Sequence, residues 1–244
     1  MRFRRIVTTA LAIVLVMGAA GLLTGLRRQA VAGTTGGIDP AAFTNPVANP
    51  YFPLKAGTVL YYVGSDGGRR FRERLTITHW TKKIQGVTTT VLLDVLRRAN
   101  DRTIAEKTWD WYADDNAGNA WYFGEKTATY TRTGNVISRD GSWQAGVHGA
   151  VAGTIMPANP HPTDAYRQEF YAGHAEDQAW IVQRTAHVSV PHRHLDQVVR
   201  SFEWTRLEPN VLSLKFYARG LGIVLERDVA GGSEIFRLVS VTHV

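Results

Sequence analysis

The chain has 244 residues, no cysteine and a formal net charge of +7. The absence of cysteine excludes disulfides, thiolate metal sites, a cysteine nucleophile and a lipidated N-terminal cysteine. Residues 1–32 contain five arginines and no acidic residue, so residues 33–244 carry 23 basic against 21 acidic side chains. A nearly neutral domain argues against a nucleic-acid partner, which normally requires a strongly basic surface.

Residues 1–32 are predicted to be a signal peptide or a membrane anchor. Residues 6–26 form an uncharged run of 21 residues, which is long enough to cross a bilayer as one helix. Three arginines precede this run and two follow it, a bias that places the rest of the chain outside the cytoplasm. Ala30-Val31-Ala32 is instead typical of a cleavage signal. Both readings predict an extracytoplasmic protein, either secreted or held at the cytoplasmic membrane through residues 6–26.

An all-β fold is predicted for the remainder of the chain. Residues 33–56 are rich in Gly, Thr, Asn and Pro, and we expect an extended tether there. Residues 57–244 are predicted to form a single domain, an antiparallel meander curled into a half-barrel or a closed barrel. The predicted strands are short β-branched and aromatic runs between turn signals: 58–63, 70–80, 87–97, 102–113, 119–124, 127–132, 165–172, 179–190, 197–206, 211–218, 221–228 and 233–243.

The aromatic run from Trp109 to Glu125 is predicted to be a β-hairpin. Asn116, Ala117 and Gly118 suit a three-residue loop, because Gly118 accepts a positive φ at little cost. This turn predicts a register in which four pairs of residues face each other: Asp115 and Asn119, Ala113 and Trp121, Trp111 and Phe123, Trp109 and Glu125. The large apolar side chains then share one sheet face. The other face carries the polar and tyrosine side chains Glu106, Thr108, Asp110, Tyr112 and Tyr122.

Residues 134–164 interrupt the strand pattern with a glycine-rich and proline-rich stretch. Loops of this length in a compact domain are usually functional or disordered. Because Trp143, Val147, Ile155 and Met156 are apolar, we expect an ordered loop that packs on one end of the sheet. This loop would then cap the opening of a barrel.

Several short segments together resemble a family of exported bacterial all-β proteins that have no established activity. The segments are Asn49–Gly57, Trp109–Glu125, Gly141–Gly146, Met156–Ala158, Tyr166–Glu169, Ala175–Asp177, Leu207–Pro209 and Lys215–Ala218. The resemblance covers roughly residues 46–228 and implies an exported β-fold without implying a mechanism. The chain departs from the family pattern at His148, where an aspartate is expected.

The sequence favours a non-enzymatic binding or envelope-associated module for an apolar or amphipathic ligand, such as a lipid. A curved sheet lined by Trp and Tyr can form a pocket of this kind, although small barrels are commonly filled by their own side chains. The candidate ligand-binding residues are Trp111, Tyr112, Trp121, Tyr122, Trp143 and His148.

No cofactor is expected, but two groups of residues are candidate metal ligands. Glu169, Glu176 and Asp177 offer hard oxygen ligands at close spacing, so calcium could bind there in a calcium-stabilised structural protein. The alternative is that these three carboxylates bind no metal and are solvated by water in turns. His187, His192 and His194 could bind zinc, but this segment is also typical of an exposed connection between strands, with no obvious carboxylate partner.

A secreted carboxylate-dependent hydrolase, similar to a glycosidase, is the alternative function. Such an enzyme needs two carboxylates that converge in a cleft. Asp110, Glu125, Glu169 and Glu203 lie beside aromatic residues that could stack on a sugar. The chain has no Gly-x-Ser-x-Gly elbow, phosphate-binding glycine loop or His-Glu-x-x-His motif, which removes the commonest hydrolase and nucleotide readings.

Overall fold

The computed structural model describes residues 37–244. The predicted leader at 1–32 and the start of the predicted tether lie outside this part of the chain. Within residues 37–244 the regular structure consists of strands and one 3-10 turn, η1 (Pro40–Phe43). No helix within that range has the length and apolar character needed to span a membrane. The all-β prediction is therefore confirmed for the described residues.

Fifteen strands are present in residues 37–244. They are β1 (Thr58–Asp66), β2 (Arg69–Ile84), β3 (Val87–Arg98), β4 (Ile104–Asp114), β5 (Ala120–Tyr130), β6 (Val136–Ser138), β7 (Trp143–Gln144), β8 (Val151–Met156), β9 (Ala165–Arg167), β10 (Glu169–Phe170), β11 (Asp177–Ser189), β12 (His194–Thr205), β13 (Leu212–Ala218), β14 (Gly222–Ala230) and β15 (Ile235–His243).

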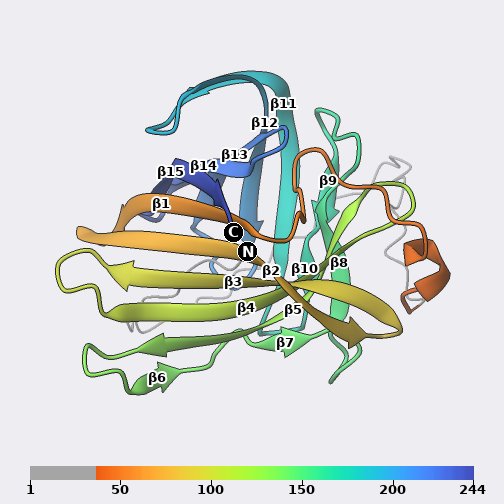
Figure 1. The fold of residues 1–244 in the computed structure, drawn as a ribbon, viewed down its shortest axis with the longest axis horizontal. Helices are drawn as coiled ribbons and strands as arrows, with labels where there is room; N and C mark the ends of the chain where they lie inside the picture. The colour runs from red at the N-terminus through yellow and green to blue at the C-terminus, as the bar shows by residue number, and fades with distance from the viewer. Residues whose placement is uncertain (1–36) are drawn as a thin grey trace, which may run out of the picture.

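Thirteen of these strands follow one another around a nearly closed antiparallel barrel. Their order is β10-β8-β5-β4-β3-β2-β1-β15-β14-β13-β12-β11-β9, while β6 and β7 pair with β5 outside this path. In Figure 1, β1 to β5 lie side by side across the lower half, and β11 and β12 stand nearly upright with their far ends bent over the top. The predicted meander is correct, and the sheet is closer to a barrel than to an open half-barrel.

The barrel is closed by one short segment, residues 165–170. Its first half, β9, pairs with β11, and its second half, β10, pairs with β8. Gln168 lies between the two halves and donates its backbone N–H to the carbonyl of Asp177 at 2.8 Å. Gly153 of β8 packs so closely on this segment that a Cβ atom there would lie 2.5 Å from the Arg167 carbonyl oxygen. The same six residues thus touch both ends of the sheet.

Residues 37–56 pack on the barrel instead of forming a free tether. Asn49 is 1% exposed, and its Nδ2 donates to the carbonyls of Gly118 and Met156. Its Oδ1 accepts the backbone N–H groups of Tyr51 and Phe52 at 2.9 Å. The prolines do prevent regular strands in this segment. Backbone N–H groups that lack a strand partner there form hydrogen bonds with the buried Asn49 amide instead.

Residues 134–164 are ordered but contain more strand than expected. β6, β7 and β8 all lie in this stretch and pair with β5, and β8 forms part of the barrel wall. A single strand, β5, replaces the two strands predicted over 119–132. The predicted strand pattern missed β8 because its residues, Val151–Met156, include a glycine and lie among turn residues.

The predicted hairpin register is correct near the turn and wrong beyond it. Ala113 faces Trp121 as expected, and the N–H of Asp115 donates to the carbonyl of Asn119. A bulge then shifts the pairing, so Trp111 faces Gly124 and Trp109 faces Lys126. Gly124 has φ 129°, and a Cβ there would lie 2.3 Å from the Trp143 carbonyl oxygen. Glycine is required at this position because β7 approaches the backbone closely.

Candidate functional site

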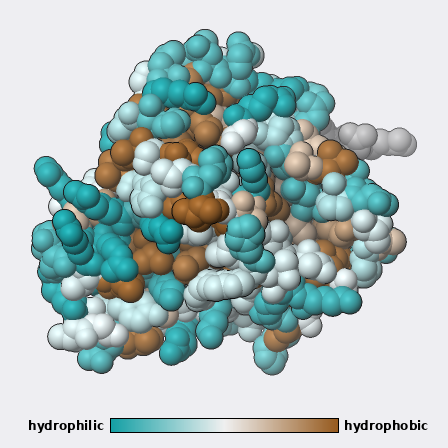
Figure 2. Space-filling model, viewed as in Figure 1, coloured by the Kyte–Doolittle hydropathy of each residue, from teal (hydrophilic) through white to brown (hydrophobic). Residues whose placement is uncertain are grey.

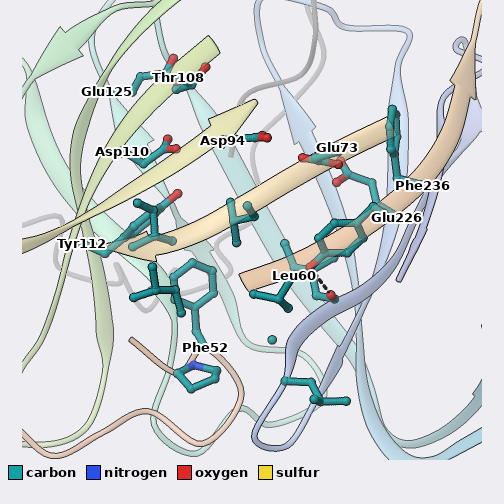
Figure 3. Close-up of a pocket in the computed structure, with 18 of the residues that line it drawn as sticks. Phe52, Leu60, Glu73, Asp94, Thr108, Asp110, Tyr112, Glu125, Glu226 and Phe236 are labelled. Atoms are coloured by element: carbon teal, nitrogen blue, oxygen red, sulfur yellow. Dashed lines mark hydrogen bonds between the residues drawn. The ribbon is translucent and has the colours of Figure 1, made fainter. Parts of the chain in front are cut away.

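A cavity inside the barrel is the candidate functional site. Polar residues from the inward faces of β2, β3, β4, β5 and β14 line one part of it: Glu73, Asp94, Glu106, Thr108, Asp110, Glu125 and Glu226. Apolar and aromatic residues line the other part: Phe52, Leu60, Ile77, Leu92, Ile223 and Phe236. Figure 3 shows Thr108, Asp110 and Glu125 grouped at one end, whereas Phe52 and Leu60 lie toward the other. The cavity is therefore amphipathic.

Alternation along β4 places the acidic group inside the barrel. Residues at even positions of this strand, from Glu106 to Tyr112, point into the cavity. The opposite face carries Trp111, which lies under the ammonium of Lys82 at 3.2 Å from the ring centroid. The polar face predicted from sequence is thus the barrel interior. The predicted apolar face is the outside of the sheet, where Phe43 packs on Phe123 with the ring centroids 5.6 Å apart.

Asp110 is the best-defined carboxylate in the cavity. It is 6% exposed, and the hydroxyl of Tyr122 donates to its Oδ1 at 2.8 Å. Burial raises the pKa of Asp110 to about 6, although the Tyr122 hydrogen bond acts in the opposite direction. A group with this pKa exchanges its proton close to neutral pH, so Asp110 can both donate and accept hydrogen bonds there.

Glu125 faces Asp110 directly on the neighbouring strand. Opposed residues on antiparallel strands have Cβ atoms about 5 Å apart, so the two carboxyl groups share one side of the cavity. Tyr112 and Tyr122 stack beside them with ring centroids 4.5 Å apart. Burial, then the charges of Asp110, Glu125 and Glu169 among others, raise the pKa values of both tyrosines well above the usual range. Both phenols therefore stay protonated, and Tyr122 donates its hydrogen bond to Asp110.

The apolar end of the cavity is closed by two chain segments. Phe52 and Pro53 come from the segment before β1, Leu221 comes from the turn between β13 and β14, and Gly222 is the first residue of β14. The N–H of Gly220 donates to the Pro50 carbonyl at 2.8 Å and joins the two segments. No residue of 134–164 lines the cavity, so the expected cap is replaced by this pair of segments.

The cavity is small. Its volume is about 50 Å³, which is room for a few ordered waters. A ligand must therefore be compact, or the segment at Phe52 must move to admit a longer one.

A second polar network, centred on Lys215, adjoins the cavity through Glu226. Lys215 is 2% exposed, and its Nζ lies 3.0 Å from Glu203 Oε2 and 3.2 Å from Glu226 Oε1. Glu203 also accepts hydrogen bonds from the Tyr217 and Ser201 hydroxyls and from Gln168 Nε2. Burial opposes ionisation of Glu203, but the Lys215 charge and the hydrogen bonds from Tyr217, Lys215 and Ser201 lower its pKa. This network is structural because its buried charges are paired.

The predicted ligand-binding residues are placed unevenly. Tyr112 lines the cavity, and Tyr122 lies behind it with Trp143 packed edge-on at 5.3 Å. Trp111 lies on the outer face of the sheet. Trp121 donates its Nε1–H to Asp115 and packs on Phe43, and His148 lies in an exposed turn. Binding by these six residues stays a prediction; of the six, Tyr112 lines the cavity and Tyr122 stacks on it.

The predicted calcium ligands do not form a compact group. Glu176 accepts the N–H of Gly173 and contacts Arg206, whereas Asp177 lies inside the barrel and is affected by the charge of Lys215. Within residues 37–244, the metal-ligating groups that converge in a set of three belong to His187, His194 and Asp196. A calcium role for Glu169, Glu176 and Asp177 stays a prediction.

Sequence reasoning missed much of the polar lining. Glu73 is 3% exposed and lines the cavity with Asp94 of β3, although Glu73 lies between the exposed Arg72 and Arg74 along β2. The alternation along the strand could have revealed this, because Glu73 lies two residues from both Phe71 and Leu75 and therefore points to the same face of the sheet as they do. Of the four acids considered for hydrolysis, Asp110 and Glu125 line the cavity, Glu169 lies near the tyrosine pair and Glu203 belongs to the Lys215 network.

Comparison with models of protein families gave no match, and comparison with curated proteins gave none either. Two solved structures are similar in outline. One, from Bacteroides fragilis, is a proposed exported protein with a YmcC-like fold, with TM-score 0.47 and 12% identity over 80% of this chain and 100% of that chain. The other, from Parabacteroides distasonis, is a proposed lipoprotein, with TM-score 0.44 and 11% identity over the same shares. Likeness at this level carries no information about the function of this chain.

Proposed function

We propose that this protein is an extracytoplasmic, non-enzymatic binding module that holds one small amphipathic molecule inside the barrel. The observation that carries the proposal is the division of the cavity lining between an acidic, hydrogen-bonding end at Asp110 and an apolar end at Phe52. The extracytoplasmic setting rests on the arginine-flanked apolar run at residues 6–26.

The polar end of the ligand is expected to donate hydrogen bonds or carry a positive charge. Among the described lining residues there is no Lys, Arg or His, while several are acidic. Asp110 and Glu125 offer carboxyl oxygens on one side of the cavity, so a group that only donates hydrogen bonds, such as an ammonium group, suits this end better than a carboxylate group, which only accepts them. The apolar end would accept a short hydrocarbon chain by excluding water from Leu60, Ile77 and Ile223.

Native mass spectrometry and calorimetry test this proposal. The full chain, purified gently from the producing cells, is expected to carry a small adduct that leaves on denaturation. In calorimetry, hexylamine should bind saturably at one site, whereas hexanoate of the same chain length should not. Asp110→Asn should weaken hexylamine binding about tenfold through loss of a charge-assisted hydrogen bond.

Asp140→Asn is the matched control, because Asp140 is exposed and lies away from the cavity lining. Equal binding of hexylamine and hexanoate, or equal weakening by Asp140→Asn, would contradict the acidic polar end. Absence of both an adduct and any saturable binding would leave a filled barrel as the better description.

Hydrolysis is a second candidate function, favoured by two properties of the Asp110–Glu125 pair. Asp110 and Glu125 oppose each other on adjacent strands, and Asp110 has a pKa of about 6, which suits a general acid. Short separation of two carboxyl groups is typical of retaining glycosidases. A panel of aryl glycosides would test this role: turnover that Asp110→Asn and Glu125→Gln each abolish would favour hydrolysis over simple binding.

A further inference from the structure

The far end of the β11–β12 hairpin carries a second polar site, remote from the cavity. One side of the hairpin is apolar, and its residues Ala186, Val188, Leu195 and Val198 pack in a cluster with β13, β14 and β15. The N–H of His192 donates to the Leu238 carbonyl at 3.0 Å, which fastens the tip to β15. The other side faces solvent, and Figure 2 shows hydrophilic side chains over this top region of the molecule. The tip of the β11–β12 hairpin, called the platform below, is thus held in place by packing on one side and exposed to solvent on the other.

Three potential ligands converge on the exposed side of this platform. Ser189 faces His194 and Val188 faces Leu195 across the two strands, and His187 and Asp196 are the next residues along them. His187 Nδ1 lies 2.5 Å from Asp196 Oδ1, and His194 Nε2 lies 3.1 Å from the same oxygen. All three ligand atoms lie within 4.8 Å of one another. Strand pairing and alternation, not a flexible loop, bring them together.

The supporting contacts also suit metal binding. The hydroxyl of Ser189 lies 2.8 Å from His194 Nδ1, which orients the ring and directs Nε2 toward Asp196. The two imidazole rings are nearly parallel, with an interplanar angle of 6°.

The ligand set indicates the kind of ion. Imidazole nitrogen and carboxylate oxygen together suit zinc and related first-row divalent ions better than calcium, which prefers oxygen ligands alone. Zinc binds such atoms at about 2.0–2.2 Å in a tetrahedron, which requires ligand atoms about 3.3 Å apart. Small rotations of three exposed side chains from the present spacing reach that arrangement. A fourth position stays open to solvent.

We propose that His187, His194 and Asp196 bind one zinc ion, or a similar divalent transition-metal ion, on the outer face of the β11–β12 hairpin. The site is independent of the cavity function proposed above. Two of the histidines singled out from sequence, His187 and His194, take part, and the carboxylate partner that the sequence did not reveal is Asp196. His192 is not among the converging ligands.

Zinc titration of the full chain tests the proposal. After treatment with a chelator, the protein is titrated with zinc in competition with a chromophoric zinc indicator. One zinc ion per chain is expected to bind. His194→Ala and Asp196→Asn should each weaken binding at least tenfold, while the matched control His192→Ala, in the same turn, should bind as the unmodified chain does.

Two further measurements keep the result decisive. Thermal unfolding of each variant without metal should match the parent, because the three side chains are exposed and contribute little to packing. X-ray absorption at the zinc edge should show two imidazole ligands with oxygen ligands. No saturable binding at one site, or binding that persists in a His187→Ala/His194→Ala double variant, would overturn the proposal.

Discussion

Asp110 shows how one residue changes character when a strand face becomes the inside of a barrel. In the sequence it is an acid between two tryptophans, and in the structure it is buried among other acids with Tyr122 as its hydrogen-bond donor. Water can no longer solvate its charge well, and that loss raises its pKa. The protonation state of Asp110 therefore connects the packing of the barrel to the chemistry of its cavity.

The stability of the protein should depend on pH through Asp110. Its folded pKa of about 6 exceeds the usual aspartate value, so the folded state binds more protons between about pH 4 and pH 6. The unfolding free energy should fall as pH rises through this window. Asp110→Asn lacks the titration and keeps an acceptor for Tyr122. Urea unfolding should show the variant gaining on the order of 2 kcal/mol relative to the parent between pH 4 and pH 7.

Buried acids that do not interact with Asp110 titrate in both proteins and cancel in this comparison. Asp177, with its pKa raised to about 6, acts in the same direction as Asp110, and Glu203, with a lowered pKa, loses its contribution only at lower pH. A constant difference between parent and Asp110→Asn across the whole range would show that Asp110 is not desolvated as described.

At the scale of an element, the irregular segment before β1 is as much a part of the barrel as the strands are. Its residue Asn49 links the β4–β5 turn, the end of β8 and its own backbone through hydrogen bonds at 2.8 to 3.0 Å. Phe52 then packs on Tyr112 with ring centroids 4.9 Å apart and closes the apolar end of the cavity.

Asn49→Ala is therefore expected to lower the unfolding free energy by about 2–4 kcal/mol, because it leaves several buried backbone groups unsatisfied. Urea unfolding measures the loss. Asn45→Ala is the control: the Asn45 side chain is exposed and makes one long contact of 3.5 Å to its neighbour Thr44. Equal loss in both variants would mean that the segment does not depend on the Asn49 amide.

Period-two alternation predicted which residues share a face, but not which face is inside. Along β4 the split between Trp111 and Tyr112 is correct, yet the polar set lies inside because residues 37–56 cover part of the apolar set. The bulge at Gly124 was also missed, since the close approach of β7 that requires it comes from residues farther along the chain. Local chemistry thus predicts pairs near a turn, while tertiary contacts decide burial and register farther away.

At the scale of the whole molecule, closure of the barrel depends on the contact between β8 and residues 165–170. Gly153→Ala should force these segments apart, because its Cβ would overlap backbone atoms of Arg167 and Gln168. We expect a loss of about 2 kcal/mol or more in the unfolding free energy, measured by urea unfolding. The amide proton of Gln168, bonded to Asp177, should also exchange faster with solvent.

Thr154→Ala, in the same strand, removes atoms instead of adding them and serves as the control. It should leave the exchange of the Gln168 amide unchanged. If the Gln168 amide proton exchanged at the same rate in Gly153→Ala as in the parent, closure of the barrel would not depend on the contact between β8 and residues 165–170.

The pairing of β1 with β15 has a consequence for how the chain reaches this structure. Most neighbouring strands are also neighbours in sequence, but Thr58 pairs with His243, at the far end of the domain. Contacts between such distant residues form slowly, because a long loop must close first. Until β15 arrives, one edge of β1 has free backbone groups and can pair with another chain. The arrival of β15 therefore sets the interval during which this edge of β1 is open to aggregation.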